Sequence, residues 1–153
     1  MRFAARAVLP LLALLAAGCV EAFRIPAPSW PPLPDGHFMH VGTFLQVSGT
    51  AKLPPGMTGE TQRRAEGRDA AIMDAWERLQ RYLESLPLPE GGTVGERCAA
   101  SGPLQTSLVN LVRSSELVST EFAGDRVAAV LRLDKTRINR FLGTQFRRSS
   151  ALP

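Results

Sequence analysis

Residues 61–86, TQRRAEGRDAAIMDAWERLQRYLESL, form the stretch on which the fold prediction depends. Large apolar side chains recur along it at spacings of four, three, four and three, at Ile72, Trp76, Leu79, Leu83 and Leu86. This spacing is typical of one face of an α-helix, and charged side chains occupy the remaining faces. The stretch therefore predicts a long amphipathic helix that ends before Pro87, with Gly67 marking a close approach to a sheet.

A period of two precedes this helix, in residues 38–53, FMHVGTFLQVSGTAKL. The odd positions are mostly apolar and the even positions mostly polar, which predicts a single strand with its odd face buried. The even positions His40, Phe44 and Gln46 would then lie on the face opposite the helix layer. We expect these three side chains to belong to a surface that binds a partner; the alternative is that the preceding proline-rich segment or a partner loop covers them.

The segment after the long helix is rich in proline and glycine. It predicts a loop over residues 87–103 that contains Cys98, and the apolar spacing in residues 104–112 predicts a short second helix. ELVSTEF (116–122) and RVAAVLRL (126–133) predict a β-hairpin with a three-residue loop.

Asp134 is placed to cap a closing helix after this hairpin. The expected fold is a two-layer α+β domain over residues 38–146, in the order strand, long helix, short helix, β-hairpin, helix. Residues 147–153 are expected to form a flexible tail.

A short basic and apolar segment begins the chain. Arg2 and Arg6 precede about a dozen uncharged, mostly apolar residues, too few to cross a bilayer core that needs ~20. The segment ends in LAAGC (15–19), which looks like a bacterial lipobox. By this resemblance a signal peptidase cleaves after Gly18, and Cys19 carries diacylglycerol and a fatty acyl chain such as palmitate. The alternative is an ordinary signal peptide that contains a cysteine.

Residues 1–18 are therefore predicted to be a cleaved lipoprotein signal peptide. Two or more acyl chains on Cys19 would anchor the chain stably, because each buried methylene contributes ~0.8 kcal/mol. Val20 stands where an Asp would retain a lipoprotein at the inner membrane, so by resemblance the chain belongs at the outer membrane, facing the periplasm or the cell surface. The proline-rich residues 19–37 predict an extended tether of roughly 50 Å; a docking ligand of the PxxP type is the alternative.

Length and charge limit the classes of function. Removal of residues 1–18 from the 153 residues leaves 135, which suits one domain, and reduces the net charge from +4 to +2. Such a charge gives little reason to expect nucleic-acid binding. With Cys19 modified, Cys98 has no partner for an intramolecular disulfide.

The strand VSGTAKL followed by RRAEGRDAAIMDAWERLQRYL, and the later basic helix DKTRINRFL, resemble a known family. The chain is similar to the Lpp-twenty type of bacterial outer-membrane lipoprotein, whose domain resembles the amino-terminal domain of flagellar assembly protein T. The matching positions are Gly49, Ala51, Arg68, Asp69, Ala70, Asp74, Ala75 and Leu79. Gly67 and the long Pro/Gly loop depart from the family pattern. The resemblance implies a non-enzymatic role in the cell envelope, in some members linked to flagella, and it carries over no catalytic residue.

No catalytic, metal-binding or cofactor-binding constellation emerges from the residue pattern. His37, His40 and Cys98 would need a fourth ligand and lack metal-site spacing. Residues 132–148 carry a local charge of +5, and we expect Arg137 and Arg140 to contact an anionic lipid surface or an acidic partner. The alternative is an ordinary solvated helix end, where cations suit the helix dipole.

The expected function is that of a non-enzymatic lipoprotein, anchored to the membrane, that binds or scaffolds another envelope component. Two alternatives stay open at this level: a self-assembling structural surface lipoprotein, and a small cell-wall hydrolase.

Overall fold

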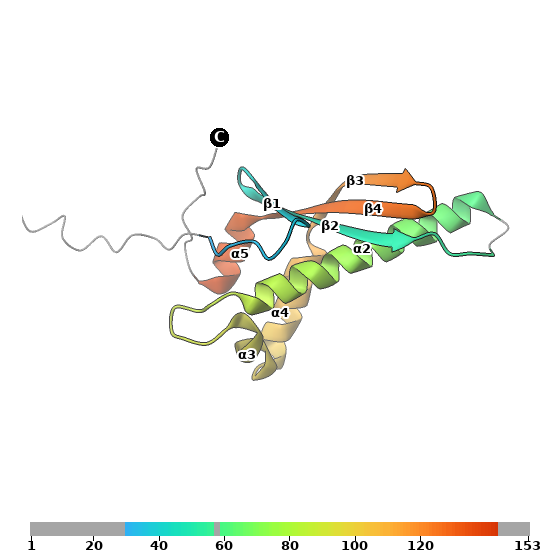
Figure 1. Ribbon diagram of the computed structural model, residues 1–153. Coiled ribbons are helices and arrows are strands. Elements are labelled where there is room, and N and C mark those ends of the chain that lie inside the picture. The colour runs from blue at the N-terminus through green and yellow to red at the C-terminus, as the bar shows by residue number, and fades with distance from the viewer. Residues whose placement is uncertain (1–29, 57–58, 144–153) are drawn as a thin grey trace, which may run out of the picture.

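The computed structural model describes residues 30–56 and 59–143. They form a mixed α+β domain around a four-stranded antiparallel sheet in the order β1-β2-β4-β3 (Figure 1). The strands are β1 (Phe38–Val41), β2 (Phe44–Lys52), β3 (Glu116–Ala123) and β4 (Arg126–Asp134). The helices are α2 (Glu60–Ser85), α3 (Val94–Ala99), α4 (Gly102–Arg113) and α5 (Lys135–Leu142). The predicted α+β class is confirmed, whereas the predictions for residues 1–18, Cys19 and 147–153 lie outside the described residues.

Helix α2 lies directly against the inner face of β2 and β4 (Figure 1). A Cβ atom added to Gly49 would lie 2.2 Å from the carbonyl oxygen of Ala71 and 2.3 Å from the backbone nitrogen of Ala75. One added to Gly67 would lie 2.5 Å from Cδ2 of Leu53, which confirms the close approach expected there. Helix and sheet therefore touch almost backbone to backbone, and only glycine fits at Gly49.

The core lies between the sheet and the carboxyl half of α2, with α3, α4 and α5 closing it. Its fully buried large side chains include Leu45, Val47, Leu79, Leu83, Leu86, Leu108, Leu131, Leu133 and Ile138. The stripe predicted from α2 thus supplies three of these leucines. Ile72 and Trp76 of the same stripe are partly buried at its margin, and the Trp76 indole donates to Ser115 Oγ at 3.0 Å.

The predicted single strand over residues 38–53 is wrong: a hairpin divides it into β1 and β2. Gly42 has a φ of 54°, and the two residues Gly42 and Thr43 make the turn. A two-residue turn reverses the chain, so even-numbered residues before the turn lie on the same face as odd-numbered residues after it. Phe38 and His40 consequently share the inner face with Leu45 and Val47, and Met39 and Val41 face outward.

The predicted loop over residues 87–103 contains a helix, α3. Thr93 begins it with a capping box, in which Thr93 Oγ1 accepts from the Glu96 amide and the Glu96 carboxylate accepts from the Thr93 amide. Cys98 lies in this helix and is buried. In the β3–β4 hairpin, Ala123 pairs with Arg126, so the turn has two residues rather than the predicted three.

The closing helix begins as predicted, because the Asp134 side chain accepts from the Thr136 amide at 2.8 Å. The amino-terminal side of the domain differs from the prediction. Trp30 is buried, Leu33 packs on the core, and the His37 carbonyl accepts from the Ser48 amide at 2.8 Å. Residues 30–37 are therefore part of the domain and do not belong to a free tether.

Candidate functional site

The outer face of the sheet is the first candidate for a binding surface, because the described helices lie on the other face (Figure 1). At the β1–β2 end, Met39 pairs with Gln46 and Val41 pairs with Phe44. Met39 is 60% exposed and Val41 is 39% exposed. Paired residues of an antiparallel ladder share one face, so these four side chains form one patch, which we call the hairpin patch.

Charged side chains border the hairpin patch. The Arg132 guanidinium lies over the Phe44 ring at 4.8 Å and pairs with the Glu116 carboxylate at 2.9 Å. Arg132 is therefore held in place by a ring on one side and a carboxylate on the other. An apolar patch with a charged rim is the usual composition of a protein-binding surface.

His40 does not belong to this patch, and the prediction that it shares a face with Phe44 and Gln46 is wrong. It pairs with Leu45 and points inward, where its ring lies 5.9 Å from the Trp30 ring. Burial, and to a smaller degree the charge of Lys135, lower the pKa of His40. Its Nδ1 atom is buried with no hydrogen-bond partner among the described residues. The neutral ring therefore serves as a packing surface for Trp30.

The predicted basic cluster is divided in the structure. Lys135 is only 3% exposed, its ammonium donates to the Gly42 carbonyl at 2.9 Å, and it lies 5.8 Å from the Trp30 ring. Burial lowers the pKa of Lys135. Arg137 and Arg140 are both exposed on α5. Because residues three apart lie side by side on a helix, these two arginines form a pair on its solvent face.

Asp134 lies beside the two arginines. The hydrogen bond from the Thr136 amide is the main reason that the pKa of Asp134 lies below its ordinary value. Burial opposes this shift, and the Thr136 side chain and the charges of Arg137 and Arg140 add smaller lowering effects. On α5 and its cap, the charges other than the buried Lys135 are Asp134, Arg137 and Arg140, which sum to +1; the +5 expected for residues 132–148 counts four more cations. Arg147 and Arg148, which supply the rest of that expected charge with Arg132 and Lys135, lie outside the described residues.

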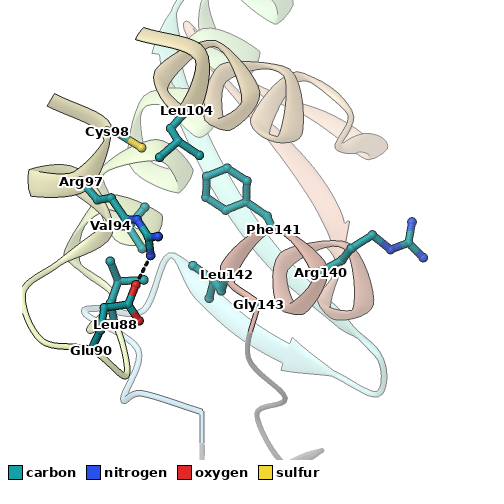
Figure 2. Close-up of a pocket in the computed structure, with 10 residues that line it drawn as sticks. All are labelled: Leu88, Glu90, Val94, Arg97, Cys98, Leu104, Arg140, Phe141, Leu142 and Gly143. Atoms are coloured by element: carbon teal, nitrogen blue, oxygen red, sulfur yellow. Dashed lines mark hydrogen bonds and ion pairs between the residues drawn. The ribbon is translucent and has the colours of Figure 1, made fainter. Parts of the chain in front are cut away.

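A cavity of about 380 Å³ lies between α3, α4, α5 and the loop before α3 (Figure 2). Its apolar walls come from Leu88, Val94, Cys98, Leu104, Phe141 and Leu142. Glu90 and Arg97 form an ion pair at its edge. Arg140 also lines it, but Figure 2 shows its guanidinium directed away from the cavity. The volume is within the range of small ligand pockets.

The reactive residue types of the described chain do not converge. Burial, and then the charge of Glu84, raise the pKa of the Cys98 thiol, which disfavours the nucleophilic thiolate. His37 Nδ1 lies 3.1 Å from Ser48 Oγ, immediately before the first pair of the β1–β2 ladder. No hydrogen bond joins the His37 ring to a carboxylate in the described part of the chain, and no three His, Cys, Asp or Glu side chains gather there as a metal-binding group.

No protein-family model, no curated protein and no solved structure matches this chain. Within residues 30–56 and 59–143, none of the helices combines the length and the apolar composition needed to cross a bilayer.

Several residues of these surfaces were not predicted from the sequence. Met39 and Val41 were expected in the core, because the alternation continues through the turn without a break. The cavity was not predicted, because α3, which forms one of its walls, was assigned to a loop. The sequence Thr93-Val94-Gly95-Glu96 has the capping-box pattern, which predicts the start of a helix at α3. This pattern could therefore have placed Cys98 in a helix.

Proposed function

We propose that this chain is a lipoprotein of a bacterial outer membrane, anchored through acyl chains on Cys19, whose domain binds another component of the cell envelope and catalyses no reaction. The observation that carries the proposal is the sequence LAAGC at residues 15–19, placed after a short basic start and an apolar segment. The similarity to Lpp-twenty lipoproteins supports the same class and includes a link to flagellar assembly.

The anchor is tested by replacing Cys19 with serine. Wild-type protein should sediment with the outer membrane, and Cys19→Ser should leave that fraction, because serine cannot carry the thioether-linked lipid on which stable anchoring depends. A Cys19→Ser chain that stays in the outer membrane in the same amount would refute lipid anchoring.

The hairpin patch is the surface that best supports partner binding. Its exposed apolar atoms lie on rigid sheet, next to an arginine that is already ordered by Glu116. Ordered side chains lose less conformational entropy on binding, so such a surface favours a specific contact. The expected partner is a protein with an apolar surface bordered by acidic groups that complement Arg132.

A pair of variants tests this surface. Met39→Lys with Val41→Lys should remove any stoichiometric companion from purified complexes, by at least about tenfold, because it places two charges in the apolar centre. Met73→Lys is the matched control, since Met73 is 50% exposed but lies on α2 in the opposite layer. A companion retained by the double variant, or lost equally with Met73→Lys, would show that the hairpin patch is not the binding surface.

Self-assembly is a second candidate that one observation favours. Strand β3 is one of the two edge strands of the described sheet, it is eight residues long, and Leu117, Val118 and Phe122 on it are exposed. Open edges pair with other strands, although the bulge between Leu117 and Ser119 opposes this. Sizing the Cys19→Ser chain decides: an oligomer that Val118→Lys converts to a monomer would favour self-assembly.

A cell-wall hydrolase is the remaining alternative, and His37 and His40 are the residues on which it would depend. His37→Ala and His40→Ala should leave the biological activity of a binding protein intact, provided that thermal melts show each variant folded. Loss of peptidoglycan cleavage in His37→Ala would contradict the non-enzymatic proposal.

A further inference from the structure

We infer that the α5 end of the domain faces the membrane and that Arg137 and Arg140 bind the headgroups of anionic phospholipids there. The inference rests on the proposed lipid anchor for its orientation, and on the described residues for its chemistry.

The two ends of the described chain lie together at this end of the domain (Figure 1). Trp30, where the described chain begins, packs against Lys135 at the start of α5, and Gly143 follows the last residue of the same helix. Eleven residue steps separate Cys19 from Trp30 in the sequence, and such a segment cannot exceed about 40 Å. An acylated Cys19 therefore keeps Trp30 and the α5 end within about 40 Å of the lipid surface.

Trp30 makes this orientation specific, because it fixes the chain to the domain at one place. Its ring is buried between His40 of β1 and Lys135 of α5, and the Pro31 carbonyl next to it lies 3.5 Å from the Tyr82 hydroxyl of α2. The segment therefore leaves the domain from a docked position and cannot swing freely about Phe38. A tether without such a dock would allow any face of the domain to approach the bilayer.

The far end of the sheet lies away from the anchor. Strand β4 runs from Arg126 to Asp134, immediately before α5, and its nine residues span about 26 Å. Lys52 and Arg126, which pair with each other at that far end, are exposed and basic like the two arginines of α5. Of these two basic pairs in the described part of the chain, the pair on α5 is the one near Trp30, where the described chain begins.

The chemistry of α5 suits an anionic surface. Arg137 and Arg140 are exposed at spacing i,i+3, with no ion pair within hydrogen-bond distance in the described residues, and Asp134 is the carboxylate that interacts with both. Arg140 is exposed, and its guanidinium points away from the cavity (Figure 2). Planar guanidinium groups bind phosphate in a bidentate manner, and each basic side chain near an anionic bilayer strengthens binding about fivefold.

Two arginines alone give weak binding, so the contact acts by orienting a protein that is already anchored. Once acyl chains hold the domain at the surface, a weak contact becomes intramolecular and is formed most of the time. The hairpin patch, on the outer face of the sheet, would then be presented sideways from the membrane at a fixed height. A partner in the envelope would meet it in one orientation.

Vesicle binding tests the inference without the anchor. The full chain carrying Cys19→Ser is sedimented with vesicles of phosphatidylglycerol or of phosphatidylcholine at low and high salt. We expect Arg137→Gln with Arg140→Gln to weaken binding to phosphatidylglycerol about 25-fold, with no change on phosphatidylcholine. The matched control is Lys52→Gln with Arg126→Gln, which removes the same charge at the far end and should retain binding.

Equal binding of the α5 variant and the parent chain, or an equal loss in the far-end control, would overturn the inference. No preference of the parent chain for phosphatidylglycerol would also overturn it. Failure of the lipid anchor is a separate result. In the fractionation experiment, the Cys19→Ser chain would then stay in the outer membrane together with the wild-type protein. All four substituted residues are exposed, so equal melting temperatures are expected and confirm that the variants are folded.

Discussion

The inner and outer faces of the sheet are built from the same alternation of residues, yet they differ in how much change they can accept. On the inner face, Gly49 touches the backbone of α2, and its neighbours Leu45, Val47 and Leu131 are almost completely buried. On the outer face, Met39 and Val41 carry large apolar side chains into solvent. A closely packed face keeps the fold, and an open face is available for binding.

The largest expected effect is at the contact between Gly49 and α2. Gly49→Val would place its first side-chain carbon 2.2 Å from the Ala71 carbonyl, so the whole helix would have to move. We expect a loss of about 4 kcal/mol or more in the free energy of unfolding, measured by urea denaturation. Gly102→Ala is the control, because no atom lies within 4 Å of a Cβ atom added at that position. A loss of stability in Gly49→Val as small as that in Gly102→Ala would contradict the close contact between Gly49 and α2.

Leu79 and Met73 allow the two sides of α2 to be compared directly. Leu79 is fully buried, so Leu79→Ala should lower the free energy of unfolding by about 2–5 kcal/mol. Met73→Ala, on the exposed side, should change it by less than about 0.5 kcal/mol. Equal values for the two variants in thermal or urea unfolding would mean that α2 does not pack as described.

Asp74 and Asp69 separate a structural carboxylate from a solvated one. Asp74 accepts from the Thr50 amide at 2.8 Å, at the edge of β2 beyond β1, and from Arg78 at 2.9 Å. Asp74→Ala should therefore lower the free energy of unfolding by about 1–2 kcal/mol. Asp69 pairs with Arg68 at the surface, and Asp69→Ala should have almost no effect in the same measurement. A larger loss of stability in Asp69→Ala than in Asp74→Ala would contradict the contact between Asp74 and the edge of β2.

The smallest expected effect is the pH dependence that His40 contributes. Its pKa in the folded state is below 6.5, because burial and the charge of Lys135 disfavour the protonated ring. The unfolded chain therefore binds more protons, and stability should fall as the pH drops from 6.5 through the lowered value. Urea unfolding near neutral and mildly acidic pH should show this slope in the parent chain and in His37→Gln. A slope that persists unchanged in His40→Leu would exclude His40 as its source.

The parts of the fold that local sequence determines were predictable. The apolar stripe of α2 has a clear helical period, the two runs around Gly124 form a hairpin, and Asp134 has the side chain that a helix start requires. The face to which His40 points was not predictable in this way. It depends on whether Gly42 bends the strand or turns the chain, and the pattern of apolar residues permits both.

Tertiary contacts explain the remaining differences. The prolines around Trp30 predict an extended tether, but Trp30 finds a buried site that only the folded sheet and α5 create. Likewise, the sequence predicts Lys135 as a surface cation. In the structure it is buried, because its ammonium donates to the Gly42 carbonyl of the hairpin turn. Of the candidate surface, Phe44, Gln46, Arg137 and Arg140 were placed correctly on accessible positions, and His40 was not.

The central claim is that this domain is held at a membrane through Cys19, and intact-mass spectrometry of protein purified from its native membrane tests it most directly. The account predicts a chain that begins at Cys19 and is heavier than its sequence by a diacylglycerol and an amide-linked acyl group. A mass equal to that of a chain with an unmodified Cys19 thiol, or one that still includes residues 1–18, would contradict it.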